Sequence, residues 1–299
     1  MKNYETQYKT IQNEILNTLY SLDNLRRTLS VEEWESFSKS HAKNHYLFKY
    51  LMKDPCTKLG FESALHYKKN TSLIDFLYGF EQINVNETDQ LGMNVFDFVF
   101  NSDPAKAFRF SLKYMAQLID ELAFRSINPI SVCSVGSGNV REAELSTAIQ
   151  QKKIKHFLAC DNDQSNNTFT RTKYGHLGIE PKLISIEEFI RNRNEVKFYD
   201  LIYAVDVLDY LDTTKAKKLI NSLFEQLKKG GYLLFSNFRE DISNSLYRTY
   251  MEVFMGWFMY YRTDEDFITM FNALNEQSIS EFSIITDPTF NINFALIRK

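Results

Sequence analysis

The sequence has no long apolar run, no excess of charge of one sign and no apolar leader. None of its apolar runs approaches the roughly 18 residues that a membrane-spanning helix requires, so no membrane span is expected. The net charge is −3, from Lys+Arg 35 against Asp+Glu 38, which does not favour binding to nucleic acid. The polar N-terminal residues lack the apolar core of a signal peptide. These absences point away from membrane proteins and nucleic acid-binding proteins.

Cysteine is also scarce. The three cysteines, Cys56, Cys133 and Cys160, are not spaced like metal ligands, so no metal site is expected. Cys133 and Cys160 lie inside apparent strands, where we expect small buried side chains. Few cysteines and no signal peptide predict a reduced, cytoplasmic setting. What the chain does have is 44% hydrophobic residues over 299 positions, enough for one large domain or two ordinary ones.

Residues 1–125 contain almost no glycine and show helical periodicity. Apolar residues recur at three- and four-residue spacing from Tyr8 to Leu22, which predicts a first amphipathic helix. Ser30 with Glu33 resembles a capping box at the start of a second helix. Pro55 breaks the pattern, and further helices are expected near 72–80 and 104–124. We predict an all-helical N-terminal domain that caps the substrate, mediates homodimerisation, or does both.

From residue 126 onward, short apolar runs alternate with amphipathic segments. The expected strands lie at 130–135, 156–160, 182–186, 200–205 and 232–235, and the helices between them at 140–151, 164–174, 187–193 and 214–228. Gly230-Gly231 is expected to form a turn directly before the fifth strand. Such alternation predicts an α/β fold with a parallel sheet and helices on both faces. After a helix near 264–276, strands at 280–286 and 291–298 are separated only by a short turn at 287–288. Residues 126–299 are therefore expected to form five parallel strands plus a C-terminal antiparallel hairpin.

A glycine turn follows the first of these strands. The apolar run 130–135 leads into Gly136-Ser-Gly138, and the next apolar run ends in Asp161. This order is typical of a nucleoside-binding βαβ unit, in which a carboxylate accepts hydrogen bonds from both ribose hydroxyls. Arg141 occupies the place of the third glycine of dinucleotide sites, and no phosphate-binding Gly-Lys-Ser/Thr loop is present. A ligand with ribose and adenine but no phosphate, such as S-adenosylmethionine, fits better. The alternative is that the two glycines only end a strand.

Several blocks resemble a known family. Their order along the chain is similar to that of the class I S-adenosylmethionine-dependent methyltransferases, with a Rossmann-like sheet. More narrowly, they resemble the bacterial 3-hydroxypalmitic acid methyl ester biosynthesis (extracellular factor) family. The resemblance covers roughly residues 50 to 299. The blocks that carry it are 54–57, 75–79, 133–142, 200–211, 227–238, 251–252 and 257–263.

The chain departs from this family at several positions. It also departs from the wider class I superfamily, because the acid that often starts the glycine motif there is Ser134 here, so one expected contact to the cofactor's ammonium group is missing. Asp206 stands where the family usually has glycine. The family's Gly-Tyr-x-Gly-Asp-Ala block appears here as His66-Tyr67-Lys-Lys69-Asn70-Thr. If that block shapes the substrate site, the substrate differs as well.

Ligands of open α/β sheets bind at the carboxyl ends of the strands, where the expected cofactor residues lie. We assign the glycine turn to the methionine part of the cofactor and Asp161 to the ribose. Residues 185–187 are expected to flank adenine, or alternatively to cap the next helix. The full expected set of cofactor-binding residues is Ser134, Gly136, Gly138, Glu142, Asp161, Asn162, Ile186, Glu187 and Asp206.

Methyl transfer from a sulfonium needs alignment and exclusion of water, while a base is needed only for hydroxyl or protonated amine acceptors. The candidate catalytic residues are Asp206, Tyr210, Tyr67 and Arg262. Residues 237–263 are rich in aromatic residues and methionine and are expected to form a lid over an apolar acceptor, with Arg262 pairing an acceptor carboxylate. The alternative is a helix packed on the N-terminal half, with Arg262 in a structural ion pair.

The expected function is that of an S-adenosylmethionine-dependent methyltransferase acting on a small molecule in a bacterial secondary-metabolite or signal pathway. O-methylation of a carboxyl or hydroxyl group is preferred. Two alternatives remain open: N-methylation of a small molecule, and a cofactor-binding or dimerisation protein without methyl transfer.

Overall fold

The computed structural model describes residues 2–65, 71–81, 87–191, 199–241 and 245–299. Contacts divide the chain into two compact units. The helical unit consists of residues 1–109 and 241–258, and the sheet unit of residues 110–240 and 259–299. The domain boundary expected near residue 125 coincides with the end of helix α7 (Asp103–Arg125), whereas the two units divide within that helix.

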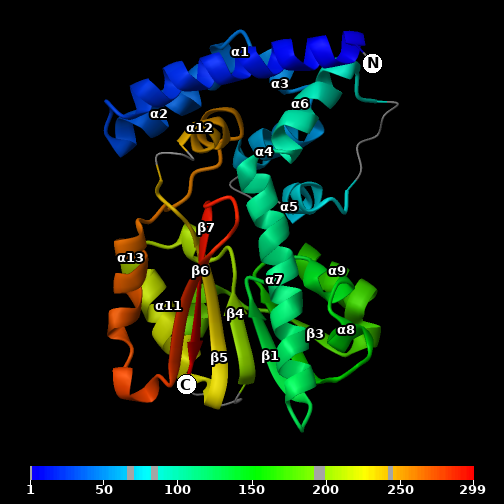
Figure 1. The fold of residues 1–299 in the computed structure, drawn as a ribbon, viewed down its shortest axis with the longest axis vertical. Helices are drawn as coiled ribbons and strands as arrows, with labels where there is room; N and C mark the ends of the chain where they lie inside the picture. The colour runs from blue at the N-terminus through cyan, green and yellow to red at the C-terminus, as the bar shows by residue number, and fades with distance from the viewer. Residues whose placement is uncertain (1, 66–70, 82–86, 192–198, 242–244) are drawn as a thin grey trace. The chain divides into compact units, whose positions relative to one another are not determined.

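The helical unit draws its helices from two separate parts of the chain. The N-terminal part supplies α1 (Lys2–Arg26), α2 (Val31–His41), α3 (Phe48–Leu51), α4 (Pro55–Leu65), α5 (Thr71–Tyr78), α6 (Gln90–Phe100) and the start of α7. The later part supplies α12 (Ser245–Phe254) (Figure 1). The capping box expected at α2 is confirmed, because Glu33 N donates to Ser30 Oγ and Ser30 N donates to Glu33 Oε2. Pro55 begins α4, as its effect on the preceding pattern predicts.

Helix α12 packs on α1 and α2. Trp34 Nε1 of α2 donates to Glu252 Oε2 at 2.7 Å, and both side chains are buried. Asp23 of α1 accepts from Ser245 Oγ at 3.0 Å and from Thr249 Oγ1 at 3.3 Å. The helix within the aromatic segment is therefore part of the N-terminal helical core, as the alternative to a lid expects. Its action as a lid stays a prediction.

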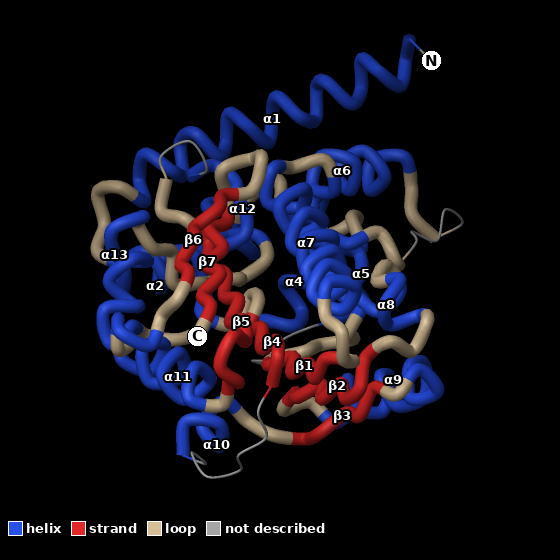
Figure 2. Tube along the Cα trace, turned by 60° about the horizontal axis from the view of Figure 1, so that its bottom comes forward, coloured by secondary structure: helices blue, strands red, loops and turns tan. Residues whose placement is uncertain are grey.

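The sheet unit contains seven strands in the order β3-β2-β1-β4-β5-β7-β6, which lie side by side in Figure 2. The first five strands are parallel, and β7 runs antiparallel to both β5 and β6. Their bounds are β1 Ile130–Val135, β2 Ile154–Asp161, β3 Ile179–Leu183, β4 Tyr199–Ala204, β5 Leu227–Phe238, β6 Glu281–Thr286 and β7 Ile292–Arg298. The predicted fold of five parallel strands closed by an antiparallel hairpin is confirmed.

Helices cover both faces of this sheet. One face packs against α10 (Ile186–Arg191), α11 (Thr213–Glu225) and α13 (Asp264–Thr269), which contribute Phe189, Leu223 and Phe267 to a common buried core. On the other face, Phe110 and Tyr114 of α7 contact the ring of Phe294 on β7. Helix α9 (Gln164–Tyr174) adjoins β2 and β3. Two layers of helices around one sheet leave the carboxyl ends of β1, β2 and β4 as the place where loops gather.

Three expectations about individual elements are wrong. Strand β3 lies at 179–183 rather than 182–186, because it is an edge strand whose exposed Glu180 and Lys182 hide the apolar pattern. The helix expected over 140–151 is replaced by a short 3-10 turn, Arg141–Glu144, and by α8 (Thr147–Gln150). The turn expected at Gly230-Gly231 lies inside β5 instead, where a Cβ atom on Gly231 would come within 2.8 Å of a neighbouring carbonyl oxygen.

Candidate functional site

The glycine turn leaves β1 at its carboxyl end and is tied to the end of β2. Gly136 and Gly138 have φ of 66° and 53°, values that L-residues with side chains rarely adopt. A Cβ atom on Gly136 would lie 2.6 Å from Cγ2 of Val207, so no side chain fits there. Ser137 N donates to Cys160 O at 3.0 Å. The glycines therefore keep the turn close to the ends of β2 and β4. Such close approach would not be needed if the glycines only ended β1.

Asp161 is the side chain that joins this turn to β2. It is buried, and its Oδ2 accepts from Gly138 N at 2.8 Å. Its Oδ1 accepts from Asp163 N at 2.8 Å and from Asn166 Nδ2 at 3.1 Å. These donors fix the carboxylate beside the turn, and Asp163 caps α9. Asn162, also expected at the cofactor, is exposed next to Asp161.

A buried carboxyl group lies behind the turn. Glu142 is 3% exposed, and Tyr203 on β4 donates its hydroxyl hydrogen bond to Glu142 Oε1. Burial raises the pKa of Glu142 to about 7, although the Tyr203 hydrogen bond acts to lower it. Tyr203 is a site residue that the sequence did not single out. The available signal was a phenolic hydroxyl in the middle of the apolar run 200–205, since a buried hydroxyl needs a partner.

Arg141, in the place of a third glycine, serves the structure around the turn. It is buried, its Nη1 donates to Glu144 Oε1 at 2.8 Å, and its guanidinium carbon lies 4.7 Å from the centroid of the Phe169 ring. Hydrogen bonds from Lys173, Tyr174 and Arg141 lower the pKa of Glu144 against the opposing effect of burial. A buried arginine held in this way does not allow the close helix–strand packing that the third glycine provides in dinucleotide-binding turns.

Asp206 follows β4 in a left-handed conformation, with φ of 58°. Its N–H donates to Ser236 Oγ at 2.8 Å, and that hydroxyl in turn donates to Asp206 Oδ1 at 3.3 Å. Aspartate is among the few residues with a side chain that tolerate this region, which glycine adopts freely. The backbone here thus explains why glycine is usual at this place in the resembling family. Tyr210, the next candidate along the chain, is 38% exposed.

Arg262 is buried, and backbone carbonyl groups bind its guanidinium. Its Nη1 donates to Leu208 O at 2.9 Å and to Asn237 Oδ1, and its Nη2 donates to Leu211 O at 2.5 Å. Burial lowers its pKa, and the nearby Asp209 acts in the opposite direction. These contacts favour a structural role, in hydrogen bonds to carbonyls rather than in the ion pair that the structural alternative expected.

The residues expected to flank adenine are mainly engaged in helix capping. Ile186 begins α10, and Glu187 is exposed in its first turn. Ser185 N donates to Glu188 Oε2, and Glu188 N donates to Ser185 Oγ. These two reciprocal hydrogen bonds cap the helix. The capping alternative is therefore confirmed, and contact with adenine stays a prediction. Tyr67, expected on the acceptor side, lies outside the described residues.

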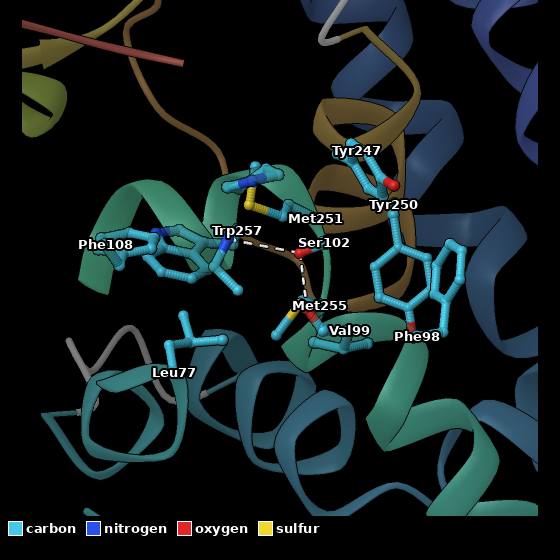
Figure 3. Close-up of a pocket in the computed structure, with 12 residues that line it drawn as sticks. Leu77, Phe98, Val99, Ser102, Phe108, Tyr247, Tyr250, Met251, Met255 and Trp257 are labelled. Atoms are coloured by element: carbon cyan, nitrogen blue, oxygen red, sulfur yellow. Dashed lines mark hydrogen bonds between the residues drawn. The ribbon is translucent and has the colours of Figure 1, made fainter. Parts of the chain in front are cut away.

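The helical unit contains an apolar pocket with about 360 Å³ of non-atom space, part of which is open solvent (Figure 3). Its walls come from α5, α6, the first turns of α7 and the segment around α12, and are mostly aromatic rings and methionine side chains. Ser102 contributes a hydroxyl that already donates to Val99 O at 2.6 Å. The lining residues are Leu77, Phe98, Val99, Ser102, Pro104, Ala105, Phe108, Tyr247, Tyr250, Met251, Met255 and Trp257.

Within the described residues, no three His, Cys, Asp or Glu side chains are placed to hold a metal ion. Across the same part of the chain, no helix is both long and apolar enough to cross a membrane. The cysteines Cys56, Cys133 and Cys160 are buried and form no disulfide, and the prediction that Cys133 and Cys160 are buried is confirmed.

Comparison with known proteins adds to this geometry. The fold is similar to a Bordetella parapertussis protein described as a possible exported protein, with 13% identity, a TM-score of 0.62 and coverage of 98% of this chain and 96% of that one. It is also similar to magnesium protoporphyrin IX methyltransferase from Synechocystis PCC 6803 with bound S-adenosylhomocysteine, with 13% identity, a TM-score of 0.50 and coverage of 75% and 91%. At such identity, these similarities show the fold alone. No curated protein matches the sequence.

A family model described as a methyltransferase domain matches residues 106–279, more than half of the chain. The match spans the glycine turn, Asp161, the buried Glu142 and the loop after β4. The chain therefore belongs to the methyltransferase domain family.

Proposed function

We propose that this protein transfers a methyl group from S-adenosylmethionine to a carboxyl or hydroxyl oxygen of a small molecule. The observation that carries the proposal is the Asp161 carboxylate, which Gly138 N holds beside the glycine turn. Gly138 and Asp206 follow β1 and β4, and Asp161 is the last residue of β2, so all three lie at the carboxyl ends of neighbouring parallel strands. A carboxylate at this edge suits a ribose diol, and a turn without a side chain suits close approach of the methionine part.

The cofactor, when bound, supplies a methyl group on a positively charged sulfur, which is already reactive. The chain then has to hold an acceptor in line with that methyl group and keep water away. Asp206 is placed for this because its left-handed backbone turns the chain directly after β4. An acceptor carboxylate needs no base at neutral pH, whereas for a hydroxyl acceptor Asp206 is the proposed base.

The apolar pocket of the helical unit supports an acceptor with an apolar part. Aromatic rings such as Phe98, Phe108 and Trp257 bury apolar surface well, and Met251 and Met255 adapt to irregular shapes. We propose that this unit selects the acceptor. The predicted homodimer through the helical domain is a separate proposal, which light scattering after size-exclusion chromatography tests directly.

The decisive experiment is turnover with S-adenosylmethionine labelled on the methyl group and small molecules extracted from cells. Transfer of label into a small molecule, with release of S-adenosylhomocysteine, is the expected result. Treating the product with alkali then separates the acceptor classes, because a methyl ester releases methanol whereas a methyl ether or N-methyl product does not. Binding of the cofactor without transfer to any fraction would instead support a non-catalytic protein.

A further inference from the structure

The methionine end of the proposed cofactor site lacks an acid where one is expected. Position 134 lies two residues before Gly136, and in this chain it carries the hydroxyl of Ser134, which is 2% exposed. An α-ammonium group that leaves water needs a partner of opposite charge or strong acceptors. Another residue close to the turn has to supply that partner.

Tyr203 connects position 134 to such a residue. Ser134 on β1 and Tyr203 on β4 are register partners, so their side chains point to the same face of the sheet. The Tyr203 hydroxyl, which lies beside position 134 in this way, donates to Glu142 Oε1. Glu142 itself follows Gly138 by four residues, on the short 3-10 turn that the glycine turn leads into. Only the side chain of Tyr203 thus separates the carboxyl group of Glu142 from position 134, where the acid is missing.

The surroundings of Glu142 lack a positive partner for its charge. Among the described residues, its side-chain hydrogen bond is to the neutral hydroxyl of Tyr203, and no lysine, arginine or histidine forms an ion pair with it. The adjacent Arg141 pairs with Glu144 instead. A buried carboxylate without a cation is costly, and such groups concentrate where a ligand supplies the missing charge.

We infer that Glu142, oriented by Tyr203, binds the α-ammonium group of S-adenosylmethionine in place of an acid at position 134. The inference rests on the proposed function, because it requires that the turn binds this cofactor. Glu142 is the binding residue, and Tyr203 is a positioning residue that keeps one carboxyl oxygen fixed. An ammonium group would supply the cation that the buried carboxylate lacks, through a charge-assisted hydrogen bond.

The test is a comparison of two ligands by isothermal titration calorimetry. One is S-adenosylhomocysteine, and the other is its deamino analogue, in which a hydrogen atom replaces the ammonium group. Wild-type protein should prefer S-adenosylhomocysteine by at least about tenfold, the value of a charged hydrogen bond. In Glu142→Gln that preference should vanish, with little change in affinity for the deamino analogue. Tyr203→Phe should reduce the preference by a smaller factor.

Glu144→Gln is the matched control, because Glu144 lies on the same short turn but pairs with Arg141 and Lys173. It should leave the preference between the two ligands unchanged, even if both bind more weakly. A preference that survives in Glu142→Gln would overturn the inference, as would equal affinities in the wild type. Failure of the wild type to bind either ligand would instead reject the proposed cofactor itself.

A second measurement needs no variant and covers the case in which Glu142→Gln fails to fold. With a pKa of about 7, Glu142 is partly protonated at neutral pH. Binding an ammonium group should drive it to the carboxylate and release a proton. Calorimetry in two buffers of different ionisation enthalpy should therefore show proton release with S-adenosylhomocysteine and none with the deamino analogue. Equal proton release with both ligands would contradict the inference.

Discussion

At Asp161 one carboxylate serves both the structure of the turn and the proposed ribose contact. Asp161→Ala should lower the affinity for S-adenosylhomocysteine by a factor on the order of ten to a hundred, because hydrogen bonds to a charged group are lost. Calorimetry measures this change. Asp163→Ala is the control, since Asp163 caps α9 through Ser165 N and makes no contact with Gly138. Unchanged affinity in Asp161→Ala would reject the ribose assignment.

Glu142 makes the stability of the fold depend on pH. Its pKa is raised from 4.5 to about 7 in the folded chain, so between these pH values the unfolded chain ionises while the folded chain keeps its proton. The free energy of unfolding should therefore fall as pH rises through this window, by about 3 kcal/mol for this group. Urea denaturation of wild type and Glu142→Gln from pH 4.5 to 8 measures the difference. Parallel curves for the two proteins would contradict it.

Single residues differed in how far the sequence could predict them. The turn at Gly136 and Gly138 was predictable because glycine directly after an apolar strand indicates a tight turn with positive φ. The left-handed backbone at Asp206 was indicated only by the resemblance, in which glycine is usual at this position, since aspartate itself occurs in many conformations. The hydrogen bond between Tyr203 and Glu142 joins residues 61 positions apart, and only the pairing of β1 with β4 brings them together.

Helix α12 is held by buried polar contacts with α1 and α2. Trp34→Phe removes the donor to Glu252 and leaves a buried carboxylate oxygen with one partner fewer. We expect the free energy of unfolding to fall by about 1–3 kcal/mol, which chemical denaturation followed by circular dichroism measures. Tyr46→Phe removes a comparable hydrogen bond to Glu14, but at an exposed site, and should cost less than about 0.5 kcal/mol. Equal losses in the two variants would show that burial does not matter here.

Elements with a clear apolar pattern were predictable from the sequence. Elements whose bounds depend on side chains from other parts of the chain were not. Strand β1 occupies the expected residues, because both of its faces are covered and its run is continuous. The connection after it is shaped by Asp120 of α7, which accepts from Ser146 Oγ, Thr147 N and Ala148 N and so fixes where α8 begins. A side chain 26 residues earlier in the sequence is invisible to local periodicity.

On the scale of the whole molecule, the chain enters the helical unit a second time between residues 241 and 258. A fragment of residues 110–299 would keep α12 without the helices that bury its apolar face. We expect this fragment to aggregate, because that face becomes exposed. Replacing residues 241–258 in the fragment by a short Gly/Ser linker should restore a monomer with native-like circular dichroism. Size-exclusion chromatography of both fragments provides the test, and identical behaviour would contradict the assignment of α12.

The linker can be short because the sheet unit joins the two ends of this segment. Arg262 N donates to Phe238 O at 3.0 Å, and Glu240 N donates to Arg262 O at 2.8 Å. From its aromatic content, the sequence predicted an insertion over 237–263, and it left open whether this segment forms a lid or a helix packed on the N-terminal half. Composition identifies the segment as unusual, but it does not show which helices the segment packs against. That depends on long-range contacts such as the hydrogen bond between Trp34 and Glu252.

The hydrogen bonds between the two ends of this segment also affect how its sequence can change during evolution. Because the chain leaves and rejoins the sheet unit at hydrogen-bonded neighbours, residues between the two anchors can be lengthened, shortened or replaced without altering the strands. Selection can then rework the aromatic and methionine side chains of the pocket while the glycine turn and Asp161 stay under separate constraint. Under the proposed role of the helical unit, the insertion is the part of the chain in which proteins with the same glycine turn are free to evolve different acceptor preferences.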